Sequence, residues 1–284
     1  MKRRFIYQIF SVLIMAPFMA SAQKLPNVQQ AGLRAPDNIK IDGKAMEWNN
    51  QFRAYNKATD IYYTLSNNDE NLYLTVQVID PRIIEKTFAG GLTLTVKNPD
   101  KKNKTMPVML TFPIIATTER GALIHKIKDP ETNIETELTG INNQLSTVLK
   151  EIHIKGITGI DTIISVYNET GIKAVSKFDI KKAYTYELAI PLKYLQTCLD
   201  NDGGFNYNIR LNGLNLSSMT IVSINGKSVG ANSPELAEAM SKIMSGNVSS
   251  VSVDANGRAT RGGSMSDLLN PTDFDGEYTL AKDK

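Results

Sequence analysis

Six side chains that could hold a small polar ligand alternate with apolar residues along three segments of the chain. They are Tyr73, Gln77, Thr185, Glu187, Asn208 and Arg210. A sugar needs flat apolar faces and converging amide, carboxylate and guanidinium groups, which these residue types supply. The same alternation fits an ordinary solvated sheet face, on which Arg210 and Glu187 either pair with each other or both face a ligand. Both interpretations follow from this one pattern.

Residues that could bind a metal are scattered. Asp200–Gly203 and Asp273–Gly276 are short acidic turns that offer oxygens to calcium, but neither continues into an EF-hand loop, and turn chemistry explains both. His125 and His153 are isolated, and Cys198 is the only cysteine, so a zinc site has no ligand set. We expect Cys198 to be a small buried residue and predict no cofactor, with structural calcium left open.

Catalytic motifs are absent from the sequence. It holds no HExxH, no GxSxG, no P-loop and no dinucleotide fingerprint. Acidic residues are scattered, so no pair is marked as a glycosidase dyad. The sequence therefore predicts a protein that is not an enzyme.

The N-terminus has the pattern of an export signal. Lys2, Arg3 and Arg4 precede an apolar run over 5–19, and Ala20-Ser21-Ala22 then offers small residues for cleavage before Gln23. The run is shorter than the ~20 residues of a membrane span. We expect residues 1–22 to be removed and the mature chain to reach the periplasm, the cell surface or the medium without a membrane span.

Loss of this leader changes the charge balance. The whole chain has 32 Lys and Arg against 29 Asp and Glu, a formal net charge of +3. All three excess bases belong to the leader, so the mature chain is expected to be neutral overall. This balance gives no electrostatic footprint for nucleic acid.

Alternation with a period of two predicts a β-rich domain. The expected strands cover 38–43, 61–65, 71–80, 92–97, 106–112, 151–155, 163–167, 172–180, 183–190, 205–211 and 274–281. Pro191 ends the strand over 183–190 and opens a short helix, PLKYLQ. We therefore predict an all-β, antiparallel β-sandwich of the jelly-roll or immunoglobulin-like kind.

One or two accessory helices are expected beside the strands. Ile134, Leu138, Ile141, Leu145 and Leu149 recur at helical spacing, after Asp129 as N-cap and Pro130 at the first position. A second helix could start at Ser233-Pro234. We expect a lead-in over 23–37 and a single domain over 38–284, with a flexible insertion at about 225–270.

Five segments occur in this order: IKIDGKAMEW, ENLYLTVQVID, ISVYNETGIKAVSKFD, YTYELAIPLKYL and PTDFDGEYTL. Together they resemble the family 9 carbohydrate-binding modules and the wider DOMON-like sandwiches, and most closely the exported members from Bacteroidetes-type bacteria. The family's scaffold motif falls on Asp42, Gly43, Trp48, Asp80 and Pro191.

The resemblance implies a non-catalytic protein that binds a saccharide and assists polysaccharide metabolism, often with structural calcium. Family members hold the sugar between two tryptophans, whereas this chain has only Trp48, which belongs to the scaffold motif. The alternative is therefore a periplasmic or surface domain that kept the sandwich, lost sugar binding and contacts a protein partner.

Overall fold

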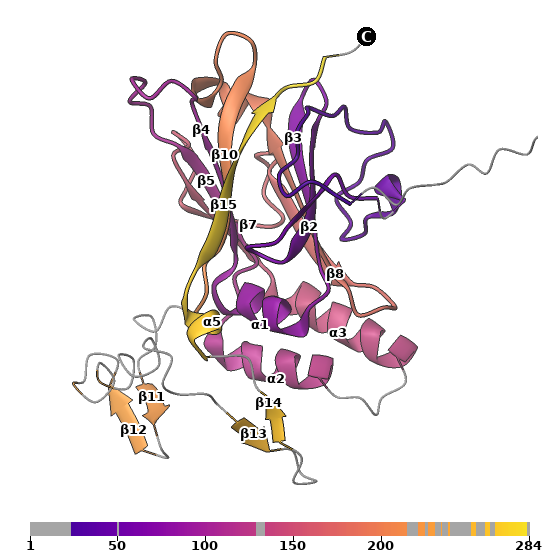
Figure 1. Ribbon diagram of the computed structural model, residues 1–284, viewed down its shortest axis with the longest axis vertical. Coiled ribbons are helices and arrows are strands. Elements are labelled where there is room, and N and C mark those ends of the chain that lie inside the picture. The colour runs from indigo at the N-terminus through magenta and orange to yellow at the C-terminus, as the bar shows by residue number, and fades with distance from the viewer. Residues whose placement is uncertain are drawn as a thin grey trace, which may run out of the picture.

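Two antiparallel sheets face each other in the computed structural model, which confirms the predicted β-sandwich (Figure 1). The structure describes residues 24–49, 51–128, 134–214 and 265–282, with short pieces at 221–224, 227–230, 234, 238, 251–253 and 259–261. Sheet A has the strand order β1 (Ala54–Asn56), β2 (Ile61–Asn67), β3 (Asn71–Val78), β9 (Tyr184–Pro191) and β8 (Lys173–Phe178). Sheet B has the order β15 (Thr272–Thr279), β10 (Gly204–Leu211), β4 (Leu92–Lys97), β5 (Val108–Phe112), β6 (Glu151–Lys155) and β7 (Ile163–Ser165).

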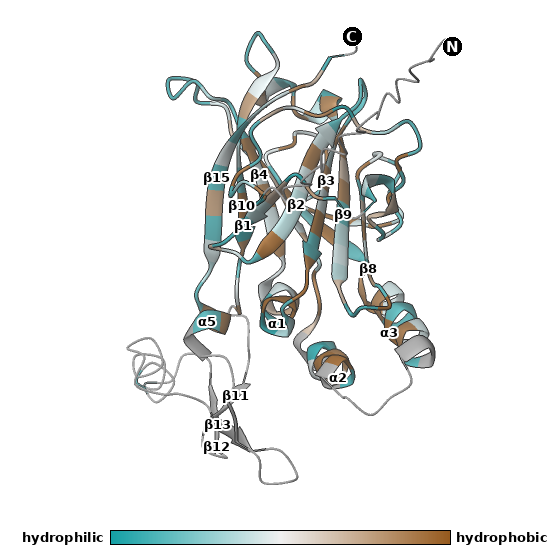
Figure 2. Cartoon of the chain, turned by 45° about the vertical axis from the view of Figure 1, so that its right-hand side comes forward, coloured by the Kyte–Doolittle hydropathy of each residue, from teal (hydrophilic) through white to brown (hydrophobic). Residues whose placement is uncertain are grey.

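The core lies between the two sheets, because each strand turns every second side chain inward. Figure 2 shows this alternation of apolar and polar residues along the strands. Tyr63 of sheet A and Tyr207 of sheet B are fully buried, and their hydroxyls hydrogen-bond across the core at 2.9 Å. Tyr184 and Leu188 are also fully buried. The predicted inward positions on these strands are therefore confirmed.

Helices gather at one end of the sandwich (Figure 1). They are α1 (Pro81–Gly90), α2 (Thr117–Lys128), α3 (Ile134–Val148) and α5 (Met265–Leu269). The predicted helix around 134–149 is confirmed as α3, whose Ile141 and Leu145 are buried. The Asn142 amide exchanges hydrogen bonds with the backbone of Phe178, so α3 is joined to the end of β8. Asp129 and Pro130 lie outside the described residues.

Helix α1 was not expected, although its start signal is present in the sequence. The side chain of Asp80 accepts a hydrogen bond from the backbone N–H of Arg82 at 2.8 Å, and Pro81 occupies the first turn. This is the usual N-cap followed by proline. The prediction that the strand continues to Asp80 was therefore wrong, because β3 ends at Val78 and Asp80 caps a helix.

The strand-to-proline corner at Pro191 was predicted nearly as it occurs. Strand β9 ends at Pro191, and two short 3-10 helices, Leu192–Tyr194 and Gln196–Cys198, replace the expected single helix. Cys198 is fully buried and free, as expected.

Residues 38–49, here called the N-terminal strap, lie against the outer face of sheet A. No strand forms over 38–43, so that prediction was wrong. The strap ends in a 3-10 helix, Met46–Trp48, and its Ala45 and Trp48 form a second buried apolar cluster with Phe52. Gly43 has φ +80°, a conformation that favours glycine. The strap thus gives sheet A a covered outer face.

Most of the predicted insertion and the whole leader lie outside the described residues. The described parts of the insertion form two small hairpins, β11 (Ile221–Ile224) with β12 (Lys227–Gly230) and β13 (Val251–Val253) with β14 (Ala259–Arg261). Of the helix expected to start at Ser233-Pro234, only Pro234 and Glu238 are described, and both are helical. No helix in the described ranges is long and apolar enough to cross a membrane.

Candidate functional site

The strap covers three of the six predicted ligand-binding side chains. Gln77, Thr185 and Glu187 point away from the core, as expected, but only 9, 2 and 0% of each residue is exposed. The Gln77 amide donates to the Thr185 hydroxyl at 3.2 Å. The expectation that these side chains form a solvated face was therefore wrong, because apolar strap residues need the same surface for burial.

Glu187 is the one of these three residues whose side chain titrates, and its pKa is shifted. Its Oε2 accepts hydrogen bonds from the backbone N–H groups of Gly43 at 2.8 Å and Asp42 at 2.9 Å. Burial raises the pKa of its carboxyl from 4.5 to about 7, although these two donors oppose the shift, and the negative charges of Glu47 and Asp42 raise it further. Glu187 Oε1 and Glu47 Oε2 are buried and have no hydrogen-bond partner among the described residues. Glu187 therefore anchors the strap.

Trp48 fixes the other part of the strap to the same strands. Its indole Nε1 donates to the Thr75 hydroxyl at 3.2 Å, and only 7% of the residue is exposed. The ring of Trp48 is thus occupied in packing and is not presented to a ligand.

Arg210 and Glu187 lie on opposite outer faces of the sandwich. Arg210 is on β10 of sheet B, 3.9 Å from Asp273 of β15, whereas Glu187 is on β9 of sheet A. Both predicted relations between them, a direct pair and a shared ligand, are therefore wrong. Strand alternation shows which side of its own sheet a residue faces, but it does not show which strands share a sheet.

Asn208 and Arg210 line a concavity on the outer face of sheet B, here called the sheet B hollow. Its volume is about 640 Å³. The lining residues come from strands β4, β5, β6 and β10, from the end of α1, and from the two residues that follow β10. They are Gly90, Thr93, Thr95, Met109, Thr111, His153, Lys155, Asn208, Arg210, Asn212 and Gly213. No described segment comparable to the strap covers this face. Two of the six predicted residues therefore lie where a ligand could reach them.

The register of sheet B arranges these side chains in two rows. Arg210, Thr93, Thr111 and His153 are consecutive cross-strand partners, and Asn208, Thr95, Met109 and Lys155 form the neighbouring row. Strands are about 4.8 Å apart, so each row spans roughly 14 Å from β10 to β6. Four of these eight positions carry a hydroxyl or an amide.

Hydrogen bonds fix one end of the sheet B hollow. The hydroxyls of Thr93 and Thr111 are 2.7 Å apart, and the Asn212 amide donates to Thr93 Oγ1 and to the carbonyl of Gly90, each at 2.9 Å. This network orients donors and acceptors before any ligand arrives. Thr93, Thr111 and Asn212 could not be singled out from the sequence, since only the strand register brings them together.

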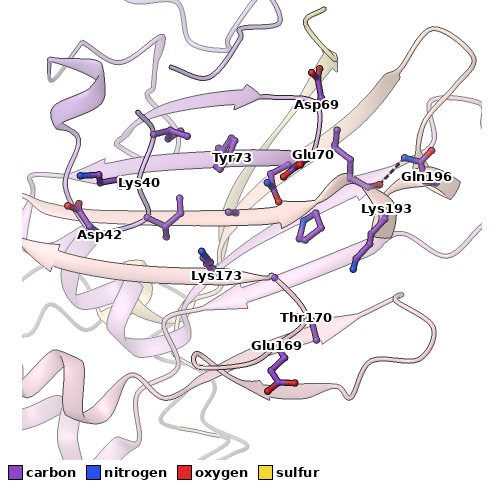
Figure 3. A pocket seen from close by; sticks show the side chains of 17 residues that line it. Lys40, Asp42, Asp69, Glu70, Tyr73, Glu169, Thr170, Lys173, Lys193 and Gln196 are labelled. Carbon is purple, nitrogen blue, oxygen red and sulfur yellow. Dashed lines mark hydrogen bonds between the residues drawn. The ribbon is translucent and has the colours of Figure 1, made fainter. Parts of the chain in front are cut away.

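Tyr73 lines a different concavity, the strap trough, between the strap and the end of sheet A (Figure 3). Its volume is about 1120 Å³, and its labelled side chains carry both charge signs, including Lys40, Asp42, Glu70 and Lys173. Tyr73 itself is 7% exposed and its hydroxyl accepts a hydrogen bond from Asn68. The trough therefore offers scattered charges rather than an aromatic platform.

The acidic segments considered for calcium have other roles. Asp200 Oδ1 accepts from the backbone N–H groups of Asp202 and Gly204, which is turn chemistry. Asp273 and Asp275 lie in strand β15, so their assignment to a turn was wrong. Across the described part of the chain, no cluster of three His, Cys, Asp or Glu could hold a metal. His153 is on β6, with its Nε2 3.7 Å from Glu151, and His125 belongs to α2.

Comparison with known proteins leaves the chain without a matched family. No protein-family model matches it, and no curated protein matches it. The resemblance to family 9 carbohydrate-binding modules therefore stays a prediction from the quoted motifs.

Proposed function

We propose that this protein is a non-catalytic saccharide-binding sandwich whose binding surface is the sheet B hollow. The observation that carries the proposal is the difference between the two outer faces. On sheet A the strap buries the polar side chains of Gln77, Thr185 and Glu187, and only the strap trough beside it stays open, whereas the sheet B hollow of about 640 Å³ keeps its hydroxyls and amides open to solvent. A saccharide held by such groups on a sheet face would therefore use sheet B.

The chemistry of this hollow supports a hydroxylated ligand. Threonine hydroxyls and the Asn208 and Asn212 amides donate and accept hydrogen bonds, as sugar hydroxyls also do. Met109 supplies an apolar contact in the middle of the neighbouring row. No Phe, Tyr or Trp is among the described lining residues, so we expect modest affinity that depends on hydrogen bonds rather than on stacking.

A glycan array followed by calorimetric titration tests the proposal. We expect the purified protein to bind one class of plant, host or microbial polysaccharide, and Asn208→Ala to weaken that binding. The matched control is Asn71→Ala, which changes the same residue type in the strap trough. Absence of binding to every polysaccharide would refute saccharide binding, and equal weakening by both variants would refute the assigned surface.

A protein-interaction domain is the second candidate, and the strap trough favours it. Its volume of about 1120 Å³ and its mixture of lysines and carboxylates suit a charged protein surface better than a neutral sugar. Retention of a specific partner by the wild-type protein, and its loss in a Lys40→Glu, Lys173→Glu double variant, would support this alternative over the first.

A further inference from the structure

Charge is distributed unevenly around the sheet B hollow. Its described lining residues include Arg210, Lys155 and His153 but no Asp or Glu. The neighbouring acids lie outside the lining: Asp273 is 3.9 Å from Arg210, Glu151 is 3.7 Å from His153, and Asp275 accepts a hydrogen bond from Asn208 at 3.5 Å. The basic groups thus line the cavity, while these acids stand beside it on β15 and β6.

The two permanent cations stand at opposite sides of the hollow. Arg210 is on β10 and Lys155 is on β6, with β4 and β5 between them, so they are separated by roughly 14 Å across the strands. Lys155 forms no ion pair with another described residue, and Arg210 keeps about half of its side chain exposed beside Asp273. Both cations remain able to receive an anionic group from a ligand.

The residues between the two cations are neutral. Thr93, Thr95, Thr111 and Met109 fill the positions on β4 and β5. A chain of sugar units that lies across the strands could place hydroxyls on the threonines and an acidic group near each cation. A neutral glycan could accept hydrogen bonds from both cations, but it would lack the stronger charge-assisted hydrogen bonds that an acidic group forms with them.

On the basis of the function proposed above, we infer that the ligand is an acidic oligosaccharide that bears carboxylate or sulfate groups and lies across β10, β4, β5 and β6. Arg210 receives an acidic group at one side through its planar guanidinium, and Lys155 receives another at the opposite side. Because these cations are exposed, their contribution depends on salt, so affinity for the acidic ligand falls as ionic strength rises.

Titration of the purified protein with matched pairs of ligands tests this inference. The carboxylate arm compares a galacturonic acid oligosaccharide with its methyl ester, and the sulfate arm compares a sulfated glycosaminoglycan oligosaccharide with its desulfated form. We expect the charged member of at least one pair to bind roughly tenfold or more tightly than its neutral partner. The arm that responds identifies the acidic group.

Three variants locate the effect. We expect Arg210→Gln and Lys155→Gln each to remove most of the preference for the charged ligand, because each weakens binding of the charged member more than binding of the neutral member. Lys173→Gln removes an exposed lysine from the strap trough and should change neither. Equal binding of charged and neutral partners, or an equal loss in Lys173→Gln, overturns the inference while saccharide binding itself stands. If none of the four ligands binds and the glycan array is also blank, the proposed function falls as well.

Discussion

Glu187 is the residue at which packing and ionisation conflict most strongly. Its carboxyl is completely buried under the strap, and burial raises its pKa from 4.5 to about 7. Two backbone N–H groups stabilise the charged form, but they compensate only part of the lost hydration. The strap is therefore held by a group that is best accommodated when protonated.

This shift predicts that Glu187 makes the protein less stable as pH rises. The unfolded chain releases the proton near pH 4.5 and the folded chain near 7, so the contribution of Glu187 is most favourable below about pH 4.5 and is lost by about pH 7. A shift of this size corresponds to about 3 kcal/mol. We expect Glu187→Gln, which mimics the neutral acid, to gain stability relative to wild type between these pH values. Urea unfolding of wild type and Glu187→Gln at about pH 4.5 and about pH 7 measures the difference in their free energies of unfolding. A difference that is the same at both pH values would contradict the predicted role of Glu187.

Trp48 should contribute less to the free energy of unfolding than Glu187 does, and its contribution can be measured separately. Trp48→Phe removes the hydrogen bond to Thr75 and leaves an aromatic ring in the cluster, so we expect a loss of about 1–2 kcal/mol in the free energy of unfolding. Thr75→Val removes the same bond from the other side. If the hydrogen bond between Trp48 and Thr75 stabilises the fold, the double variant will lose less free energy of unfolding than the two single variants lose together. Denaturant unfolding of all three variants measures these losses.

For single residues, the sequence indicated on which side of the sheet a side chain lies, but not whether that side chain is exposed to solvent. Alternation correctly placed Gln77, Thr185 and Glu187 on the side of sheet A away from the core. It could not show that a segment about 140 residues earlier covers them. Polar residues buried beneath a second layer have the same spacing as polar residues in water, so the predicted face was partly a buried interface.

The strap, as an element, depends on the backbone conformation at Gly43. Its φ of +80° is unfavourable for other residues, and an added Cβ would lie 2.9 Å from Lys177 Cγ. We expect Gly43→Ala to lower the free energy of unfolding by about 2 kcal/mol and to change the fluorescence of Trp48, the only tryptophan. Gly159 also has φ +80° but has no atom within 4 Å of an added Cβ, so Gly159→Ala is the matched control. The role of the strap would be contradicted if both variants lost the same free energy of unfolding and neither changed the fluorescence of Trp48.

Helix α1 depends on its N-cap and borders the sheet B hollow at its other end. The carbonyl of Gly90 accepts from the Asn212 amide, which also donates to Thr93. We expect Asp80→Ala to cost about 1 kcal/mol and Asp80→Asn, which can still cap, to cost clearly less. Thermal unfolding of the two variants distinguishes them, and equal losses would indicate that the cap contributes little.

Strands and helices were predicted correctly where apolar residues recur with one period, of two for a strand or about 3.6 for a helix, over the whole segment. Strands β3, β4, β9 and β10 and helix α3 were anticipated for this reason. Helix α1 was missed because its ten residues, PRIIEKTFAG, follow directly after a strand whose alternating pattern was extended to Asp80. Helix α2 carries a weak pattern, TTERGALIHKIK, with no clear apolar stripe. Strand order, and with it the composition of either outer face, depends on long-range pairing that no local pattern encodes.

The two outer faces of the sandwich differ. The strap buries Gln77, Thr185 and Glu187 on sheet A and leaves the strap trough at the end of that sheet. The helices occupy one end of the sandwich (Figures 1 and 2). The outer face of sheet B keeps its hydroxyls, amides and cations beside a hollow of about 640 Å³. We therefore propose that saccharide binding uses sheet B alone.

Blocking each concavity in turn tests this assignment most directly. Thr95→Trp places a large ring in the sheet B hollow, and Thr170→Trp places the same ring in the strap trough. Calorimetric titration with neutral xylan and cellulose oligosaccharides and with galacturonic acid oligosaccharides would compare both variants with wild type. The account predicts that Thr95→Trp abolishes binding and that Thr170→Trp binds as wild type does. Undiminished binding by a folded Thr95→Trp protein would contradict it.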